Sequence, residues 1–531
     1  MLVDTDVLII GAGFSGVGFA IRLQQKFPRV NYEIYDKAEK LGGTWWFNTY
    51  PGCACDVPSH LYSYSFALNP DWSAQFAPQA EIESYCRSVA EKHDIPRHIT
   101  FRSTVQSATF DEASQTWVVS ILDQQTGQVY KRRTRVLISA VGLLSEPNDC
   151  HIPGREEYTG RVFHSARWDH GFEWEGKDVV VVGNGCSATQ FVPVLSANPG
   201  AARKVTQFIR QPHWLEERPN PRYSATVRWI FRNVPFVMRC FRAAIFFYLE
   251  SYFTTFDRIA GKKIRESRTK KQTAYIRRAA PERYHDVLVP KMELGCKRRV
   301  MDTDYLACLH RENMELVPDD PIESFTATGV QTKSGRDIHA DAVVLATGFK
   351  ATQPLFPMEI VGEKGVSLTE HWQNSTSHAP QAYYGSCVSG FPNFFMLIGP
   401  NTATGHTSVI FTAECQIEFT LKVLQPVLAN LHAQPSLLSR LNPFSRSLPD
   451  TVAVTAEAEE KESRWIDEAS SKFVWTSGCA SWYLHPSGRN STLYPDSQLR
   501  FWLRSVFVPI SRDFVYRSCS ASETVEDEKT K

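Results

Sequence analysis

Short apolar runs followed by glycine-rich turns mark two places in the chain where a parallel sheet is expected. The first run, Asp6–Ile10, leads into Gly11-Ala-Gly13-Phe-Ser-Gly16, and a periodic apolar helix then extends to about Lys26. The next apolar run, Tyr32–Tyr35, ends at Asp36. Strand, glycine turn, helix, strand and acid in this order predict a dinucleotide-binding βαβ unit.

Each residue type in this unit has a physical reason. Gly11 and Gly13 let the backbone approach a pyrophosphate, and Gly16 lets the helix pack closely against the strand. The helix N-terminus offers free N–H groups and the positive end of its dipole to the phosphates. Asp36 is expected to accept hydrogen bonds from the hydroxyls of an unphosphorylated ribose, which favours FAD in this unit.

The same pattern recurs after the apolar run Asp178–Val182, with a helix expected from near Thr189 and a following strand Lys204–Ile209. The second turn consists of Gly183, Asn184, Gly185, Cys186, Ser187 and Ala188. Ala188 replaces the third glycine, where only close packing is required. The strand ends at Arg210 rather than at an acid, and a guanidinium pairs with a ribose 2′-phosphate, so this unit is predicted to bind NADPH.

These elements predict an α/β fold with two Rossmann-like dinucleotide-binding domains. We place the FAD-binding domain at residues 1–150 and 345–531, and the NADPH-binding domain at 151–344 between its two parts. A helical insertion is expected at about 225–283. Two further apolar strands that end in glycine, Arg135–Gly142 and Asp341–Gly348, are expected at the edges of the nucleotide sheets. The polar end of the chain, 520–531, is predicted to be disordered.

Composition narrows the class of protein. The chain has 531 residues, of which 43% are hydrophobic and 22% charged, as in an ordinary globular protein. Its formal net charge of +1 gives no general attraction to nucleic acid. The first strand begins almost at Met1, which leaves no room for a signal peptide. Twelve irregularly spaced cysteines are therefore expected to be reduced in a cytoplasmic, intracellular protein, and no metal site is expected.

One segment, Val234–Phe256, is rich in aromatic and apolar residues, so we compare its length with that of a transmembrane helix. Its longest uncharged run, Ala243–Leu249, is far shorter than the roughly 20 apolar residues that cross a bilayer. A transmembrane span is therefore not expected. We expect a buried helix, or one that lines an apolar substrate entrance, and a peripheral membrane contact stays open as an alternative.

Two further strings carry a family resemblance. The first runs from Gly42-Gly43-Thr44-Trp45 through Tyr50-Pro51-Gly52 to Asp56, and the second lies between the two predicted domains. The second string contains Tyr158, Gly160, His164, Trp168 and Asp169. Both resemble the class B flavoprotein monooxygenases and, among them, the type I Baeyer–Villiger monooxygenases, with Tyr158 where Phe is usual. The segments 399–408 and 479–495 also look like this family.

The resemblance implies roles for individual residues. Arg298 is the expected catalytic arginine and Asp56 the acid that orients it, with Arg299 as an alternative to Arg298. His164 is expected to hold the linker between the domains rather than to transfer a proton. Contacts to FAD are implied for Thr44, Trp45, Asp56, Val57, Tyr62 and Val105. Contacts to NADPH are implied for Gly183 through Thr189, Arg210, Gln211, Lys297 and Arg298.

By the same resemblance, the reaction inserts one oxygen from O2 next to a ketone carbonyl and gives an ester or lactone. A permanent cation beside the flavin favours oxygen in its anionic, nucleophilic form. The substrate is expected to be a large apolar ketone of fungal-type secondary metabolism. The alternatives are an N- or S-oxygenating flavin monooxygenase and a non-catalytic redox-sensing flavoprotein. A disulfide reductase is disfavoured because Cys53 and Cys55 lack the required spacing. The oligomeric state stays open.

Overall fold

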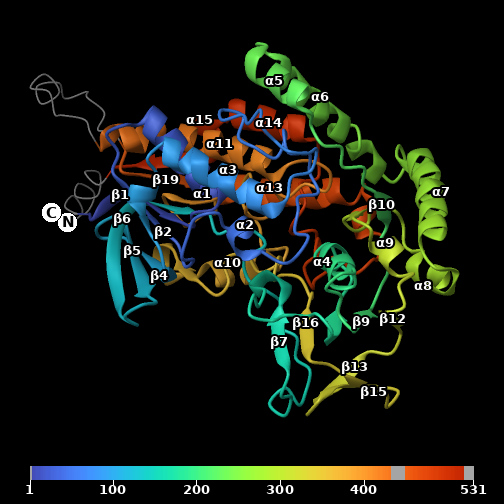
Figure 1. The fold of residues 1–531 in the computed structure, drawn as a ribbon. Coiled ribbons are helices and arrows are strands. Elements are labelled where there is room, and N and C mark those ends of the chain that lie inside the picture. Colours follow the sequence, from blue (N-terminus) through green and yellow to red (C-terminus); the bar gives the residue numbers. More distant parts are fainter. Residues whose placement is uncertain (1–2, 432–448, 519–531) are drawn as a thin grey trace, which may run out of the picture.

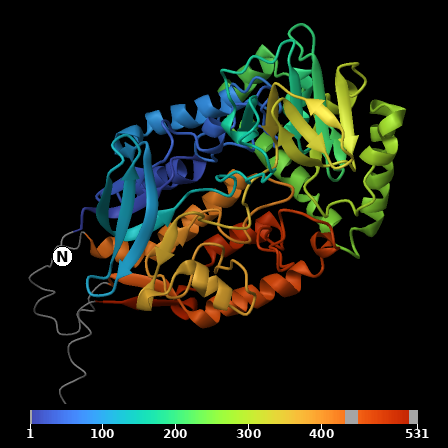
Figure 2. The ribbon, with the colours of Figure 1, turned by 90° about the horizontal axis from the view of Figure 1, so that it is seen from below.

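Two sheets carry the two glycine turns, a mixed sheet on the left and a parallel sheet at the lower right of Figure 1. The computed structural model describes residues 3–431 and 449–518. The predicted disordered end, 520–531, lies outside these residues. Seen from below in Figure 2, the C-terminal segments in orange and red pack beside the blue N-terminal half.

The first sheet has the strand order β17-β4-β5-β6-β1-β2-β3, with β18 beside β6. The predicted strands and helix are confirmed as β1 (Thr5–Ile10), β2 (Tyr32–Tyr35) and α1 (Phe14–Lys26). The other strands of this sheet are β3 (Ile99–Thr100), β4 (Ser103–Asp111), β5 (Thr116–Asp123), β6 (Val129–Ser139), β17 (Glu359–Val361) and β18 (Phe394–Met396).

The second sheet has the order β12-β9-β8-β16-β7, and every neighbouring pair is parallel. The predicted elements are confirmed as β8 (Asp178–Val182) and β9 (Lys204–Ile209), and α4 (Ala188–Leu195) begins one residue before its expected start. The remaining strands are β7 (Arg161–His164), β12 (Met314–Pro318) and β16 (Ala342–Leu345). β17 and β18, which follow the second sheet in the chain, rejoin the first sheet, whereas β19 (Thr451–Val454) and β20 (Phe514–Arg517) form a separate pair.

The two strands expected at sheet edges lie inside the sheets instead. β6 pairs with β5, β1 and β18, and β16 lies between β8 and β7. The side chains of Ala342, Val343 and Val344 have no exposed surface. A strand that is apolar on both faces is stable only where both faces and both edges are covered, which is the sheet interior.

Helices cover the first sheet and connect it to the C-terminal segments. α11 (Val409–Asn430) packs against α1 on one side and against α14 (Gln498–Val506) on the other. The other elements of this half are α2 (Thr44–Phe47), α3 (Gln79–Lys92), α10 (Leu368–Asn374), α13 (Ala456–Ser470), α15 (Ile510–Asp513), β19 (Thr451–Val454) and β20 (Phe514–Arg517). Around the second sheet lie α8 (His285–Leu288), α9 (Tyr305–Cys308), β10 (Leu215–Glu217), β11 (Val300–Asp302), β13 (Ile322–Thr326), β14 (Gly329–Thr332) and β15 (Asp337–His339).

The helical insertion forms a green arm along the top and right of Figure 1. It consists of α5 (Ala225–Asn233), α6 (Val237–Glu250) and α7 (Lys262–Ala279). The expectation that α6 is a buried helix is wrong, because only Leu249 of this helix is buried. Its inward face instead carries Arg242, which donates to the carbonyls of His60 (2.7 Å) and Leu61 (3.1 Å). No helix within residues 3–431 and 449–518 is long and apolar enough to cross a membrane.

The expectation that all cysteines are reduced is also wrong. Cys296 and Cys479 form a disulfide, with Cα atoms 6.3 Å apart and 183 residues between them in sequence. Local spacing gives no sign of such a pair, since the fold alone brings the two segments together. Cys53 and Cys55 are free and buried.

Gly16 offers a test of the close packing between α1 and β1. A Cβ at this position would lie 1.9 Å from the carbonyl oxygen of Gly11. Gly16→Ala is therefore expected to push α1 away from the sheet and to lower the thermal midpoint by about 5 °C. Gly185→Ala is the matched control, because a Cβ there meets no atom within 4 Å. Equal midpoints for the two variants, measured without nucleotide, would contradict this account.

Candidate active site

A cavity of about 1630 Å³ lies between the two glycine turns and is lined by residues of both. Gly11 and Gly13 form its wall on one side, and Gly183 and Gly185 on the other. The helices that follow these turns, α1 and α4, have no side-chain cap at their N-termini. Their first N–H groups are therefore available to anionic ligands, as expected where a diphosphate binds.

The first glycine turn is shaped for close approach of a ligand backbone. Gly11 has a φ of +106°, and a Cβ there would lie 2.7 Å from the carbonyl oxygen of Ala140. Asp36 lies at the cavity wall and accepts hydrogen bonds from the N–H groups of Ala12 (2.6 Å) and Ala38 (2.7 Å). Burial raises the pKa of Asp36, and these two N–H groups oppose the shift. A carboxylate has further lone pairs, so it can still accept ribose hydroxyls.

The residues expected around the flavin lie together. Trp45 donates from its indole nitrogen to the Tyr62 hydroxyl (3.0 Å), and the two rings meet edge to face. The cavity wall also includes Thr44, Asp56, Val57 and Val105. This side of the cavity combines apolar rings with a few polar groups, which suits a flat aromatic cofactor.

On the other side, two cations lie where the second nucleotide is expected. Arg210 and Lys297 both line the cavity, and the Lys297 ammonium donates to the Gln211 side chain (2.5 Å). Asn184 donates to the Gln211 carbonyl (3.0 Å), which connects this group to the glycine turn. Burial lowers the pKa of Lys297, and Arg210 lowers it further. Two adjacent cations suit a phosphate.

The centre of the cavity holds an ion pair between the two domains. Arg298 donates from Nε (2.9 Å) and Nη2 (2.7 Å) to one oxygen of Asp56. Its Nη1 donates to the carbonyl of Thr404 (3.3 Å). Burial raises the pKa of Asp56, but the Arg298 charge and hydrogen bonds outweigh it, so the pKa lies below its usual range. Both groups are therefore charged at neutral pH.

Arg299, the alternative to Arg298, points away from the cavity. It donates to a Glu216 carboxylate oxygen (2.8 Å) and lies over the ring of Tyr252, 4.3 Å from its centre. Arg298 is therefore the arginine that faces the site.

Several expected residues lie outside the cavity wall. Gly16, Ala188 and Thr189 pack the starts of α1 and α4, and Thr189 donates to the Cys186 carbonyl (3.2 Å). The linker string also lies outside. Its Tyr158 hydroxyl donates to the Ala340 carbonyl (2.8 Å), and Asp169 pairs with Arg161 (2.5 Å).

His164, Gly160 and Trp168 pack the linker into the second domain. A Cβ on Gly160 would lie 2.2 Å from the Tyr158 hydroxyl oxygen, and Trp168 packs against Phe191 of α4. His164 accepts from the Ala166 N–H (3.0 Å) and is 9% exposed. Burial is the main cause that lowers its pKa to about 4, so the ring is neutral.

Sequence patterns did not reveal two connections at the site. Gln190 of α4 accepts from the Tyr50 hydroxyl (3.0 Å) and donates to the Ala54 carbonyl (3.0 Å), which ties the second domain to the first. The buried His406 contacts both Glu250 of α6 (3.2 Å) and the Thr404 hydroxyl (3.0 Å). Both connections join segments that are far apart in the sequence, so no local spacing of residues predicts them.

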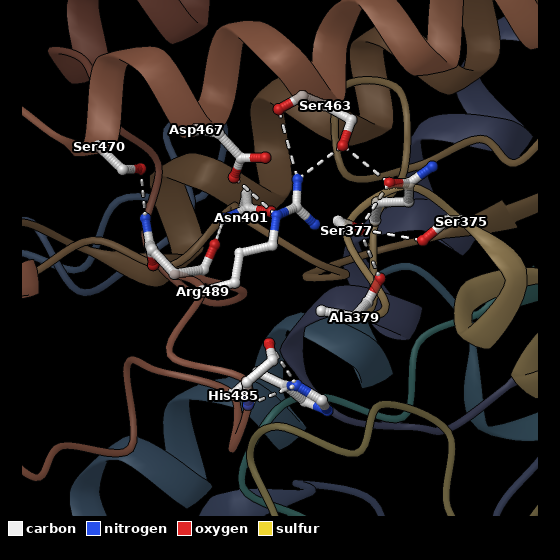
Figure 3. A network of polar contacts seen from close by, with 12 residues as sticks. Ser375, Ser377, Ala379, Asn401, Ser463, Asp467, Ser470, His485 and Arg489 are labelled. Atoms are coloured by element: carbon white, nitrogen blue, oxygen red, sulfur yellow. Dashed lines mark hydrogen bonds and ion pairs between the residues drawn. The ribbon is translucent and has the colours of Figure 1, made fainter.

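A C-terminal loop closes the cavity on its apolar side. Leu143, Ala403 and Leu484 line this wall, with the buried Tyr483 and Phe256 behind them. Arg489 anchors the loop to α13 by donating to Asp467 (2.7 Å) and Ser463 (2.7 Å), as Figure 3 shows. No residue of the helical insertion, 225–283, lines the cavity. The expectation that the aromatic segment Val234–Phe256 lines an apolar substrate entrance is therefore also wrong.

Comparisons with known proteins agree with this geometry. The family model "Flavin-binding monooxygenase-like" matches residues 4–371. A Baeyer–Villiger monooxygenase of Pseudomonas aeruginosa is 35% identical over 93% of this chain and 88% of its own. The FAD-binding monooxygenase ktnD of Aspergillus niger is 35% identical over 93% and 79%. A steroid monooxygenase bound to NADP superposes with a TM-score of 0.81 at 26% identity, over 97% of this chain and 99% of that one.

The chain therefore belongs to the flavin-binding monooxygenase-like family. It is an NADPH-dependent flavoprotein monooxygenase of the Baeyer–Villiger type, with FAD as its cofactor.

The neutral, buried His164 predicts a pH dependence of stability. An unfolded imidazole titrates near pH 6.5, whereas the folded one stays neutral down to about pH 4. In this window the unfolded chain binds the extra proton, so the free energy of unfolding falls as the pH drops. His164→Asn keeps an acceptor for the Ala166 N–H and removes the titration. Its thermal midpoint is expected to fall less steeply between about pH 6.5 and 4.5 than that of the wild type. The exposed His151, changed to Asn, serves as the control, and parallel slopes for His164→Asn and wild type would contradict the role of burial.

Proposed function

We propose that the protein oxidises a large apolar natural-product ketone of secondary metabolism to an ester or lactone. The observation that carries the proposal is a permanent cation, Arg298, held by the carboxylate of Asp56 at the centre of the cavity. Bound FAD, once reduced by NADPH, supplies the activation of O2.

The lining of the cavity supports an apolar substrate. Its volume of about 1630 Å³ includes the sites proposed for both nucleotides, so the proposal rests on the character of the wall and not on the volume. The wall near Leu143 and Leu484 is apolar and is backed by buried aromatic side chains. The relative in Aspergillus niger agrees with a fungal-type role.

The role proposed for Arg298 follows from its charge and its partners. A guanidinium cannot lose its proton near neutral pH, so it stabilises anionic oxygen at every stage of the reaction. Asp56 holds Nε and Nη2, and the Thr404 carbonyl holds Nη1. The guanidinium is thereby oriented before substrate arrives, which is the condition for electrostatic preorganisation.

We propose the nucleotide roles from the residues that line each side of the cavity. Gly11, Gly13 and Asp36 would hold the adenosine diphosphate of FAD, and Trp45, Tyr62 and Val105 would surround its ring. Gly183 to Ser187 would hold the diphosphate of NADPH. Arg210 and Lys297, joined through Gln211, would bind its 2′-phosphate.

Purified protein with NADPH, O2 and a panel of ketones, amines and sulfides tests the proposed reaction. Apolar cyclic ketones of increasing size are expected to gain one oxygen by mass spectrometry, with one NADPH consumed per product. If amines or sulfides gain oxygen and none of the ketones does, the result would favour the N- or S-oxygenating alternative and would contradict the proposal.

The adjacent arginines allow a matched comparison in this assay. Arg298→Lys cannot keep both hydrogen bonds to Asp56, so ester formation is expected to fall about a hundredfold or more while FAD stays bound. NADPH oxidation is expected to continue without product. Arg299→Lys makes the same chemical change outside the cavity and is expected to retain activity. Similar activities in the two variants would overturn the role of Arg298.

Arg210 predicts the choice between the two nicotinamide nucleotides. Arg210→Ala is expected to raise the KM for NADPH about tenfold or more and to leave the KM for NADH unchanged. Steady-state kinetics with the two nucleotides measure this effect. An equal change for both would show that Arg210 does not contact the 2′-phosphate.

A further inference from the structure

Two helices on the upper side of Figure 1, α6 and α14, carry exposed apolar side chains. On α14 the exposed apolar row consists of Leu499, Trp502, Leu503 and Val506, and Phe507 follows directly after the helix, with exposed fractions from 36% to 74%. The inward face carries the buried Phe501 together with the polar Gln498 and Ser505. A surface helix normally presents polar residues on the face opposite its buried side.

α6 also carries exposed aromatic side chains, although Ile245, Phe246 and Leu249 pack inward. Phe236, just before the helix, is 75% exposed, and Phe247 and Tyr248 are 60% and 63% exposed. Its charged Arg242 points inward, where it contacts two backbone carbonyls and lies 3.7 Å from the Glu414 carboxylate. The inward Arg242 keeps its polar partners only in this orientation, so the aromatic side chains must remain outside.

The two exposed rows are neighbours. The backbone N–H of Leu499, at the start of α14, donates to Glu250 at the end of α6 (3.4 Å). Both helices also lie against α11, since the Phe246 ring of α6 contacts the Phe411 ring and α14 packs against α11. We call the two exposed rows together the α6–α14 face.

The charges of the helical insertion that contains α6 are mostly basic. Residues 218–283 contain sixteen Lys and Arg against four Asp and Glu, although the whole chain has a net charge of only +1. Glu250 is the one acid on α5, α6 and α14, and it is bound to His406 and Leu499. Arg239 is exposed on α6, and α7 adds the exposed Lys262, Lys263, Lys270 and Lys271.

We propose that the α6–α14 face binds the surface of an anionic lipid bilayer. Helices with an apolar aromatic face and basic flanks lie in the interface between headgroups and acyl chains. Basic residues then add attraction to anionic headgroups. A second copy fits less well, because two such faces would bring their basic segments together. The cavity stays open, since neither α6 nor α14 lines it.

Flotation of the full-length holoprotein with lipid vesicles tests the proposal. The probes are vesicles of phosphatidylcholine alone and of phosphatidylcholine with phosphatidylserine in about a 3:1 ratio. The wild type is expected to float with the mixed vesicles and much less with the neutral ones. Phe236→Glu and Phe507→Glu are each expected to lower the bound fraction about tenfold or more, because each places a charge on the apolar row.

Val129→Glu is the matched control, because Val129 is 55% exposed on β6 of the first sheet, away from this face. It is expected to bind vesicles like the wild type. Thermal midpoint and FAD content are expected to be unchanged in all three variants, since the replaced side chains are exposed. Failure of the folded wild type to float at low salt would overturn the proposal. Equal binding to both vesicle types, or unchanged binding of both Phe variants, would also overturn it. A dimer that forms without lipid and that Phe507→Glu dissociates would show instead that a second copy of the chain covers this face.

Discussion

The ion pair between Asp56 and Arg298 is the constraint on which the site depends. Each group would be costly to bury alone, and the two are tolerated because they neutralise each other and share two hydrogen bonds. Asp56 belongs to the loop before α3 in the first domain, whereas Arg298 precedes β11 in the second. The pair therefore ties the relative position of the two sheets to the position of the Arg298 guanidinium.

Other contacts reinforce this junction from several directions. Gln190 joins α4 to the loop at Tyr50, and the Cys296–Cys479 disulfide joins the Arg298 segment to the C-terminal loop. Arg489 then holds that loop against α13. Two distant segments, at Asp56 and Thr404, bind the guanidinium directly, and the other contacts hold the segments that lie next to them.

Much of the fold could be predicted because the decisive signals are local. The strands at 32–35, 178–182 and 204–209 were placed to the residue, since a buried parallel strand is continuously apolar and the glycine turn marks its end. The family resemblance, rather than any spacing, pointed to Arg298. Its distinction from Arg299 needed the structure, because neighbouring side chains of an irregular segment can point either way. The disulfide and the contacts of Gln190 depend on long-range packing that no local pattern records.

The error at α6 has a more general physical cause. An amphipathic sequence specifies that a helix has two unlike faces, but it does not specify which face turns inward. Burial of aromatic side chains is the usual outcome, yet here the core offers Arg242 two backbone carbonyls and the Glu414 carboxylate. These partners offset part of the cost of placing a guanidinium on the inward side of the helix. The outward aromatic row is thus a direct consequence of where the polar partners lie.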